Sequence, residues 1–467
     1  MTRVAVIDSG VANLASVASA FRRLGAEVFV ATSAEDLRDA SHLVLPGVGA
    51  FGPAIAALRS AGLDAALIEA VRDGVPLLAI CLGMQLLCEG SEESPGTAGL
   101  GLVPGICRRL PDSVSVPHLG WNLVAAPSGA RWLSTGWAAF ANSYALREAS
   151  PGIHAAFTTH GVQFVSALEW ANVLACQFHP ELSGVWGAGL LRRWLTGSRA
   201  ADGEALCAEA KGGYPAGLAR RLIPCLDVRD DRVVKGVQFQ QLREVGDPVE
   251  RAVEYEKQGA DEVVILDVAA SPRGMLAATR TVRRVREAIS IPLVVGGGVA
   301  DFRDAASLLQ AGADKVSLNT AAVKRPRLIS ELAERFGTQC VVLAIDARRK
   351  SDRYEVLINS GSVAVDLDPI AWAREGVALG AGEILLTSWD RDGTRIGLDL
   401  ELLRGVARAV RVPVIASGGV GSVEDVCRAF DAGAAAVLAA SVLHSGDLSV
   451  MDIKRVLWQK GVGVRPW

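Results

Sequence analysis

The chain has 467 residues, too many for one ordinary domain of about 100–200 residues, so two or more domains are expected. Half of the residues are hydrophobic and 21% are charged, a composition that supports large buried cores and excludes a disordered or fibrous chain. The formal net charge of −3 gives no broad basic field, so we expect no nucleic-acid partner.

The sequence also lacks the patterns of membrane and secreted proteins. Its most apolar runs, such as 75–88, are shorter than the roughly 18–20 residues of a membrane span. The first residues include the acidic Asp8 and no long apolar stretch, unlike a signal peptide. Eight cysteines without Cys-x-x-Cys spacing are typical of reduced thiols, and the six histidines form no metal-ligand cluster. We therefore expect a cytoplasmic protein with no membrane partner and no metal.

In the first 200 residues, short apolar strands alternate with helical patterns, which predicts α/β architecture with parallel strands. A strand at Val4–Asp8 precedes a helix at 14–24 that ends at Gly25. Further buried strands are predicted at Leu43–Pro46, Leu77–Ile80 and Val173–Phe178.

Between Thr196 and Ala219 the pattern lapses into an Ala- and Gly-rich stretch, which predicts a linker. The rest of the chain again alternates strands with helices, and eight strands in about 250 residues match a (β/α)8 TIM barrel. These strands are predicted at 221–228, 262–267, 292–297, 315–319, 341–346, 383–388, 413–417 and 435–440. The predicted division is an N-terminal domain at 1–197, a linker at 198–217 and a barrel at 218–467.

The barrel region repeats internally, because 292–323 aligns without gaps on the segment that starts at Pro413. The matching pairs include Pro292 with Pro413, Gly297 with Gly418, Gly298 with Gly419 and Gly312 with Gly433. A half-barrel duplication explains this repeat.

Cys81 lies between an apolar strand and a helical stretch. Such a turn projects the sulfur outward and places it at a helix N-terminus, which favours the thiolate. His179 and Glu181 follow another strand, where Glu181 can orient the imidazole and His179 can activate Cys81. The segment 46–49 offers backbone N–H groups that suit an oxyanion. A lone strand-end cysteine is usually a buried hydrophobe, but the three features together predict a thiol nucleophile.

At these residues the sequence resembles class I glutamine amidotransferases, and more narrowly the glutaminase of the imidazole glycerol phosphate synthase family. The resemblance covers 1–195 and is carried by Ala5–Asp8, Asn13-Leu14, Pro46–Gly49, Ile80–Gln85, Pro117–Asn122 and Gln177–Glu181. It implies an open α/β sheet with Cys81 as nucleophile and His179 and Glu181 as its partners. It also implies Gly49 and Gln85 as contacts for the substrate glutamine.

Several positions depart from the family pattern. Ala79 stands where the family has Gly, Asn142 where a His precedes Ser-Tyr, and Leu182 where a basic residue follows His-Pro-Glu. Ser9 and Ala12 stand where Tyr and Gly are common. None of these belongs to the triad, but Asn142 and Leu182 bear on the regulation of the glutaminase and on the domain interface.

Two glycine segments follow the third and seventh barrel strands, and each is completed by small polar residues after the next strand. Glycine lets the backbone approach an anion, and hydroxyl or amide groups add donors, so each set predicts a phosphate site. Glycines alone could merely close tight turns, but both sets together favour a substrate with a phosphate at each end. The sets are Gly297, Gly298, Asn319 and Thr320, and then Ser417, Gly418, Gly419, Ala440 and Ser441.

Asp227 ends the first barrel strand and Asp346 ends the fifth, on opposite sides of the barrel. Barrel enzymes place their catalysts at the carboxyl ends of strands. A single Asp there could cap a helix, but two in duplicated positions between two phosphate sites predict an acid–base pair.

Over 218–467 the sequence resembles the cyclase of the same family. The resemblance is carried by Arg221–Val228, Val234–Val237, Gly312–Val316, Asn319–Val323, Gln339, Ala344–Ala347, Leu386–Ser388 and Asp390–Thr394. It implies further substrate contacts from Lys235, Thr387, Asp392 and Gly393.

Four charged residues, Arg221, Glu262, Lys315 and Glu383, open the first, second, fourth and sixth barrel strands. Arg221 lies six residues before Asp227, so both can face inward at opposite ends of the barrel, roughly 20 Å apart. In most barrels such charges form salt bridges at the stabilising face. The resemblance implies instead a charged ring at the mouth of an ammonia channel.

Together the two resemblances imply a fused enzyme of histidine biosynthesis without a metal or organic cofactor. Glutamine is hydrolysed at Cys81, and the ammonia passes to the barrel, so that each domain is the other's functional partner. There it reacts with phosphoribulosyl-formimino-aminoimidazole carboxamide ribonucleotide and gives imidazole glycerol phosphate and aminoimidazole carboxamide ribonucleotide. Two alternatives stay open: a phosphosugar isomerase barrel that ignores ammonia, and a binding or regulatory protein with a vestigial cysteine site.

Overall fold

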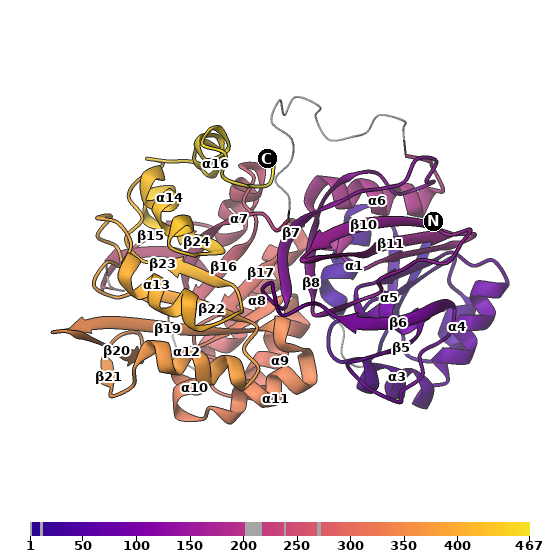
Figure 1. Cartoon of the computed structure of the whole chain (residues 1–467), viewed down its shortest axis with the longest axis horizontal. Coiled ribbons are helices and arrows are strands. Elements are labelled where there is room, and N and C mark those ends of the chain that lie inside the picture. Colours follow the sequence, from indigo (N-terminus) through magenta and orange to yellow (C-terminus); the bar gives the residue numbers. More distant parts are fainter. Residues whose placement is uncertain (1, 10–12, 201–216, 238–239, 269–271) are drawn as a thin grey trace. The chain divides into compact units, whose positions relative to one another are not determined.

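The computed structural model describes residues 2–9, 13–200, 217–237, 240–268 and 272–467 (Figure 1). The chain divides into two compact units, Met1–Leu218 with Arg335–Gly337 and Ala219–Glu334 with Thr338–Trp467. Most of the predicted linker at 198–217 lies outside the described residues, as does Ala12. No helix in the described parts of the chain is long and apolar enough to cross a membrane.

The first unit is built on a mixed sheet whose described strands follow the order β10-β11-β12-β4-β3-β1-β2. The strands are β1 Arg3–Ile7, β2 Glu27–Ala31, β3 His42–Leu45, β4 Leu77–Ile80, β10 His154–His160, β11 Val162–Trp170 and β12 Val173–Cys176. Strands β1 to β4 and β12 run parallel, whereas β10 and β11 add an antiparallel edge that the sequence analysis did not predict. Smaller strands outside this sheet are β5 Cys88–Ser91, β6 Val103–Arg109, β7 His118–Val124, β8 Gly136–Asn142 and β9 Tyr144–Ala145.

Helices cover both faces of this sheet. They are α1 Leu14–Arg23, α2 Ala34–Arg38, α3 Phe51–Ser60, α4 Leu63–Arg72, α5 Leu82–Leu87, the 3-10 helix η1 Pro180–Leu182 and α6 Gly184–Thr196. Phe51 and Leu67, from α3 and α4, belong to one hydrophobic core, and Phe21 and Trp194, from α1 and α6, belong to the other. The central strands are therefore buried on both sides, which explains their nearly continuous apolar sequence.

The predicted strands of this unit are confirmed to within two residues. Strand β4 has the predicted bounds, and β12 ends at Cys176 rather than Phe178. The reason is that the chain then leaves the sheet: the His179 N–H donates to the carbonyl oxygen of Ala139 in β8, at 2.8 Å.

The turn between β4 and α5 depends on a very close backbone approach. Cys81 has φ +51°, in the left-handed region that non-glycine residues seldom adopt. A Cβ atom on Gly83 would lie 2.0 Å from the carbonyl oxygen of Leu45. The start of α5 therefore rests directly on the end of β3, and this contact holds the strained cysteine in place.

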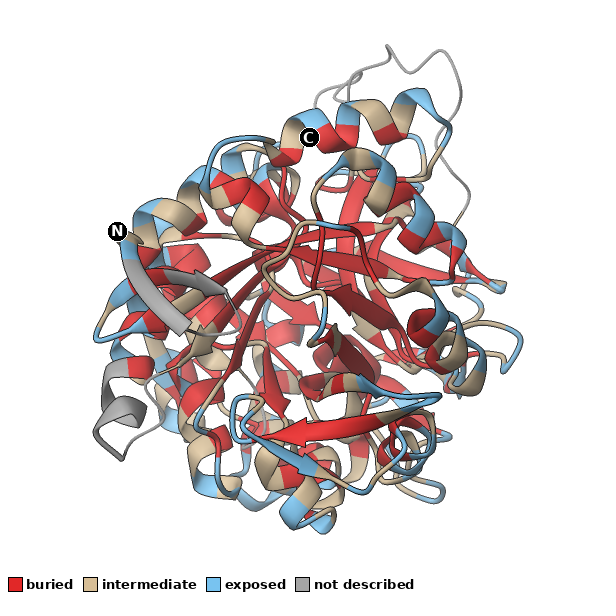
Figure 2. Cartoon of the chain, turned by 90° about the vertical axis from the view of Figure 1, so that its left-hand side faces the viewer, coloured by how far each residue is buried: buried red, intermediate tan, exposed pale blue. Residues whose placement is uncertain are grey.

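The second unit is a closed barrel, and its described parallel strands follow the order β13-β16-β17-β18-β19-β22-β23-β24, with β24 pairing back to β13. Their bounds are β13 Arg221–Arg229, β16 Val263–Asp267, β17 Leu293–Gly296, β18 Lys315–Leu318, β19 Val341–Lys350, β22 Glu383–Ser388, β23 Val414–Ser417 and β24 Ala436–Ala439. The predicted (β/α)8 barrel is thus confirmed. Figure 2 shows these buried strands ringed by helices whose outer sides are exposed.

The helices of the barrel unit alternate with its strands. They are α7 Pro248–Lys257, α8 Pro272–Ala288, α9 Phe302–Ala311, α10 Thr320–Lys324, α11 Arg327–Phe336, η2 Thr338–Cys340, α12 Pro369–Ala378, α13 Leu400–Ala409, α14 Val423–Asp431, α15 Ser441–His444 and α16 Val450–Gln459. Inside the barrel, alternate strand residues such as Ile223, Val264 and Ile415 form one apolar cluster.

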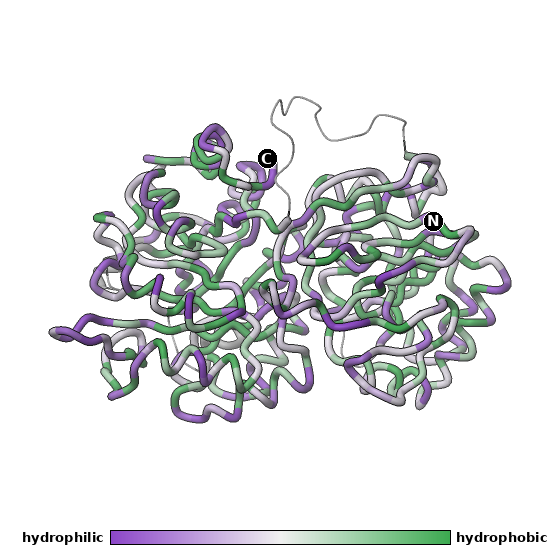
Figure 3. The backbone as a smooth tube through the Cα atoms, viewed as in Figure 1, coloured by the Kyte–Doolittle hydropathy of each residue, from purple (hydrophilic) through white to green (hydrophobic). Residues whose placement is uncertain are grey.

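The prediction that Asp227 and Asp346 end their strands is wrong. Strands β13 and β19 continue past these residues because each pairs with an antiparallel strand, with Asp227 opposite Val234 and Asp346 opposite Leu357. The added strands are β14 Arg232–Val237, β15 Gln240–Gly246, β20 Arg353–Ile358 and β21 Val363–Val365. Figure 3 shows that the turn between β19 and β20 is hydrophilic, as expected for a hairpin that extends into solvent.

The duplicated glycines occupy equivalent structural positions. Gly297 has φ +88° and Gly418 has φ +91°. A Cβ atom would lie 2.0 Å from the carbonyl oxygen of Asp267 in the first case, and 2.7 Å from that of Ser388 in the second. Packing and backbone conformation therefore already require glycine at both positions, whatever the loops bind.

We expect Gly83→Ala to destabilise the first unit by about 1–3 kcal/mol, because its Cβ cannot fit against Leu45 without backbone movement. Urea unfolding of the full chain, followed by tryptophan fluorescence, measures the effect. Gly189→Ala in α6 is the matched control, because its nearest contact is the mobile end of Arg193 at 3.4 Å. It should be neutral or stabilise by up to about 1 kcal/mol, and equal effects of the two changes would contradict the packing argument.

Candidate active sites

The three predicted residues of the cysteine site lie together at the carboxyl ends of two neighbouring strands. Strands β4 and β12 pair in parallel, with Ile80 opposite Cys176, so Cys81 and His179 follow adjacent strand ends. The Nδ1 atom of His179 lies 2.8 Å from Oε1 of Glu181, and both side chains are buried. Glu181 therefore orients the ring and leaves Nε2 for other chemistry.

The electrostatics of this group favour a charged imidazole. Burial alone lowers the pKa of His179, but the charges of Cys81 and Glu181 and the hydrogen bond to Glu181 hold it well above its usual value. Among the residues that the structure describes, none is a hydrogen-bond partner of the buried Nε2 atom. A cysteine beside a histidine that a buried carboxylate orients is an arrangement that can activate a sulfur nucleophile.

The loop 46–49 lies beside this turn, because β3 pairs in parallel with β4. The Leu82 N–H donates to the carbonyl oxygen of Gly47 at 3.3 Å, and Gly49 has φ +108°. The predicted oxyanion segment therefore contacts Leu82, the residue that directly follows Cys81.

Gln85, the expected glutamine contact, lies in α5 and is buried. Its Nε2 atom donates to the main-chain carbonyl of Tyr144 at 2.9 Å and to Oε1 of Gln177 at 3.1 Å. Asn142, which departs from the family pattern, donates to the same Tyr144 carbonyl at 3.1 Å. Leu182, another departure, is buried within η1.

In the barrel, Asp227 and Asp346 share one electrostatic neighbour. Burial and the charge of Asp392 raise the pKa of Asp227 to about 7, and the same two causes raise that of Asp346 to about 7. Asn319 donates to Asp346 at 2.9 Å, and Thr387 lies opposite Asp346 in the adjacent strand. A carboxyl group with a pKa near 7 can both give and take a proton at neutral pH.

Asp392 is therefore more than the substrate contact that the sequence suggested. It acts on both aspartates, and burial raises its own pKa, although the Gly393 N–H opposes this by donating to it. Sequence reasoning missed this role because the charge coupling depends on where the loop after β22 folds. The sequence held one indication of this role, because Asp392 lies a few residues after the end of a barrel strand.

The predicted phosphate-binding residues lie at or directly after the carboxyl ends of their strands, with Ser417 as the last residue of β23. Asn319 and Ala440 directly precede the short helices α10 and α15. The hydroxyl of Thr320 accepts from the Asn359 N–H at 2.8 Å, so it keeps its own O–H for a ligand. Lys235 lies on β14, but its side chain lies outside the described residues.

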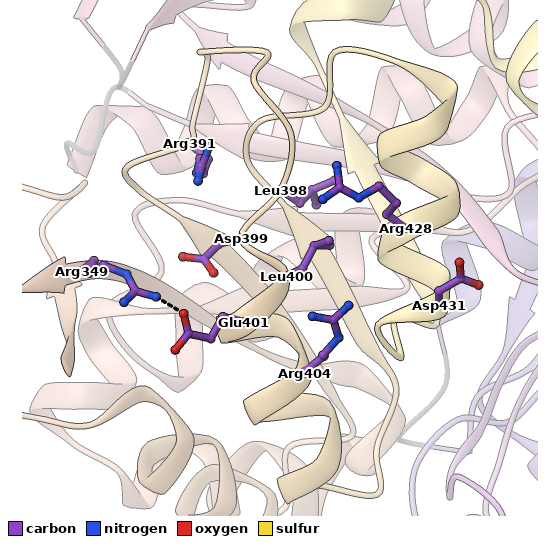
Figure 4. A pocket seen from close by; sticks show the side chains of 9 residues that line it. All are labelled: Arg349, Arg391, Leu398, Asp399, Leu400, Glu401, Arg404, Arg428 and Asp431. Carbon is purple, nitrogen blue, oxygen red and sulfur yellow. Dashed lines mark hydrogen bonds and ion pairs between the residues drawn. The ribbon is translucent and has the colours of Figure 1, made fainter. Parts of the chain in front are cut away.

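A separate pocket of 540 Å³ lies beside α13 and α14 (Figure 4). It is lined by Arg349, Arg391, Leu398, Asp399, Leu400, Glu401, Arg404, Arg428 and Asp431. An ion pair between Arg349 and Glu401 crosses one side of it. None of the predicted site residues lines this pocket, so it is distinct from the aspartate site.

The four charged residues at the other ends of the strands form a closed, buried ring. Arg221 contacts Glu262 at 2.9 Å and Glu383 at 2.5 Å, and Lys315 contacts the same two glutamates at 2.6 and 2.7 Å. Burial raises the pKa of Glu383, but Arg221 and Lys315 outweigh it and hold the pKa below its usual value. These residues are therefore not the exposed salt bridges that a barrel surface usually carries.

Comparisons with known proteins match the two units separately. A family model described as glutamine amidotransferase class-I matches residues 5–195, and one described as histidine biosynthesis protein matches residues 221–449. The imidazole glycerol phosphate synthase subunit HisF of Pyrobaculum aerophilum is 56% identical over 250 residues, covering 53% of this chain and 99% of that protein. The subunit of the same name from Myxococcus xanthus is 55% identical over 249 residues, covering 53% of this chain and 98% of that protein.

We expect Asp392→Asn to shift the pH profile of the barrel reaction toward lower pH. The Asp392 charge raises the pKa of Asp227 and Asp346, so its removal lets both carboxyls ionise at lower pH. The measurement is turnover against pH with the concentration of free ammonia held constant. Asp390→Asn, an exposed change in the same loop, is the control. An unchanged profile in Asp392→Asn would show that the three carboxyls are not coupled.

Proposed function

The chain belongs to the imidazole glycerol phosphate synthase family and carries a class I glutamine amidotransferase domain in the same polypeptide, and from this premise we propose how its two sites work. It is a fused amidotransferase and cyclase of histidine biosynthesis. The substrates are glutamine and phosphoribulosyl-formimino-aminoimidazole carboxamide ribonucleotide. The observation that carries the assignment of the first site is the buried group of Cys81, His179 and Glu181.

In the glutaminase, the Cys81 thiolate attacks the carboxamide carbon of glutamine. His179 gives its proton to the departing ammonia, which leaves a glutamyl thioester on the sulfur. His179, held by Glu181, then takes a proton from water, and the hydroxide releases glutamate and restores the thiolate. The raised pKa of His179 suits it to the first, acidic step.

In the cyclase, Asp227 and Asp346 move the protons that ring closure and product cleavage require. Their pKa values of about 7 let one serve as the acid while the other serves as the base. The glycine loops with Thr320 and Ser441 hold the two phosphates at opposite sides of the barrel mouth. The products are imidazole glycerol phosphate and aminoimidazole carboxamide ribonucleotide.

Ammonia reaches the aspartates through the ring at the other end of the barrel. Each cation of the ring contacts both glutamates, so a small neutral molecule passes only when one side chain moves. Lys315 is the residue that moves in this proposal, because its ammonium lies on a flexible stem, whereas the planar Arg221 guanidinium holds its two glutamates in a fixed geometry.

Because the chain belongs to the imidazole glycerol phosphate synthase family, the family assignment excludes the alternative in which the barrel is a phosphosugar isomerase. The preserved triad argues against a vestigial cysteine site. We also place the protein in the cytoplasm, a proposal that the free state of the described cysteines supports.

The test of the proposal separates the two nitrogen sources. Cys81→Ala should abolish product formation from glutamine, because no other group at this turn can form the thioester. The same variant should keep turnover with ammonium salt at raised pH, since free ammonia enters the barrel reaction directly. Cys107→Ala, a buried cysteine of the same unit, is the control and should keep both activities. Glutamine hydrolysis by folded Cys81→Ala would refute the role of the thiol.

Lys315→Met tests the ring. Loss of the ammonium leaves Glu262 and Glu383 with one cation in place of two, which should open or distort the ring. The ratio of glutamate to imidazole glycerol phosphate should rise well above one, because ammonia escapes before it is used. Lys460→Met, which removes an exposed pair with Glu424, is the matched control. If the ratio of glutamate to imidazole glycerol phosphate stays at one in Lys315→Met, the ring has a structural role only.

A further inference from the structure

We propose that Gln177 is a fourth catalytic residue of the glutaminase, whose side-chain amide donates a hydrogen bond to the sulfur of Cys81. The proposal rests on the proposed role of Cys81 as the nucleophile. Neither the triad nor the expected substrate contacts include this amide.

The position of Gln177 brings its amide to the reacting atom. It follows β12 directly, beside the strand that delivers Cys81, and it is completely buried. Its Nε2 atom lies 3.6 Å from the Cys81 sulfur, a normal separation for a hydrogen bond to sulfur. A buried amide in contact with a nucleophile either stabilises its charge or opposes it, and the choice depends on which end of the amide faces the sulfur.

The hydrogen-bond partners decide this orientation, since the nitrogen and oxygen of an amide are otherwise hard to tell apart. The main-chain carbonyl of Tyr144 can only accept, so the Gln85 atom that contacts it at 2.9 Å is the amide nitrogen. The same nitrogen contacts the Gln177 amide at 3.1 Å, where it must meet the oxygen. The nitrogen of Gln177 is then the end that faces Cys81.

A second branch of the network begins at the same Tyr144 carbonyl and has its own fixed direction. Asn142 also gives its nitrogen to the Tyr144 carbonyl, so its oxygen faces Nδ1 of His118 at 3.3 Å, and that ring nitrogen carries the proton. The other ring nitrogen of His118 then accepts from Asn122 at 3.0 Å, whose amide also donates to the Thr159 carbonyl at 3.0 Å.

This branch requires a neutral His118 with one proton. The ring is completely buried, and burial together with the charge of His160 holds the pKa of His118 well below its usual value. Main-chain carbonyls at Tyr144 and Thr159 thus set the direction of every amide between them. The network has one consistent arrangement of protons, and in it Gln177 is a donor.

A donor at this point serves the reaction in two ways. An N–H group binds a thiolate more strongly than a thiol, so it favours the reactive form of Cys81. It also restrains the sulfur, whose backbone already lies in a strained conformation. Gln85 takes part indirectly, because its amide holds Gln177 in the donating orientation.

Two variants of the full chain test the proposal. Gln177→Met keeps a similar volume without a donor, and Gln177→Glu keeps the shape but replaces the donor with an oxygen. The measurement is the rate constant for alkylation of Cys81 by iodoacetamide at neutral pH, with Cys81→Ala giving the background from other cysteines. Both variants should react at least about tenfold more slowly, and glutaminase kcat should fall by about 10²–10³-fold, as for loss of one donor at a reacting atom.

Two controls separate this effect from unfolding and from a general charge effect. Cyclase turnover with ammonium salt should stay normal in both variants. Gln163→Glu, an exposed change on β11, should leave both the alkylation and the glutaminase rates unchanged. If Gln177→Met loses the ammonia-dependent activity as well, the isosteric Gln177→Glu decides the question.

Alkylation at the wild-type rate in the folded variants would overturn the proposal, even if glutaminase kcat falls, because the amide would then act on substrate or packing rather than on the sulfur. Failure of the underlying function gives a different result. In that case Cys81→Ala would still hydrolyse glutamine, whatever the alkylation rates of the Gln177 variants.

Discussion

Both sites of this chain depend on the direction of parallel strands. In a parallel sheet all carboxyl ends meet at one edge, so residues far apart in sequence become neighbours when each follows its own strand. Cys81 and His179 meet in this way because β4 and β12 are paired. In the barrel the same constraint collects Asp227 and Asp346 at one end and the residues that open the strands at the other. The side-chain alternation of each strand then decides which of these residues face inward.

The ring of charged residues at the amino ends of the barrel strands shows under which condition charged groups can be buried there. Charges this deeply buried are tolerated only when each is paired, and removal of one partner is costly. The backbone around the ring is held from outside by Asp261, which accepts from the Leu222 N–H at 2.9 Å and pairs with Lys454 at 2.6 Å. Burial lowers the pKa of Lys454 to about 7 although Asp261 opposes the shift. Asp261 and the neighbouring N–H thus connect the C-terminal helix α16 to the residues beside Arg221.

The sequence predicted what depends on local pattern and repetition. Apolar runs located the central strands, and the duplicated glycines located two equivalent loops whose backbone conformation requires them. Strand β10 was not predicted because it lies at the edge of the sheet, where one-sided burial weakens the apolar pattern. Strand β11 lies inside the sheet and is buried over 164–169, but Gln163, Ser166 and Glu169 interrupt its apolar sequence. The extensions of β13 and β19 depend on pairing with hairpins and not on their own residues. The orientation of Gln177 depends on partners from three separate segments, which no local pattern reveals.

The two sites perturb their titrating groups in opposite ways. At His179 the neighbours carry the opposite charge and favour the protonated ring against the effect of burial. At Asp227 and Asp346 burial and the like charge of Asp392 act together and favour the neutral acids. Three coupled carboxyls cannot all ionise without mutual repulsion, so the barrel site retains a proton near neutral pH. Because Asp392 acts on both aspartates, a change in its charge moves the pKa values of Asp227 and Asp346 together.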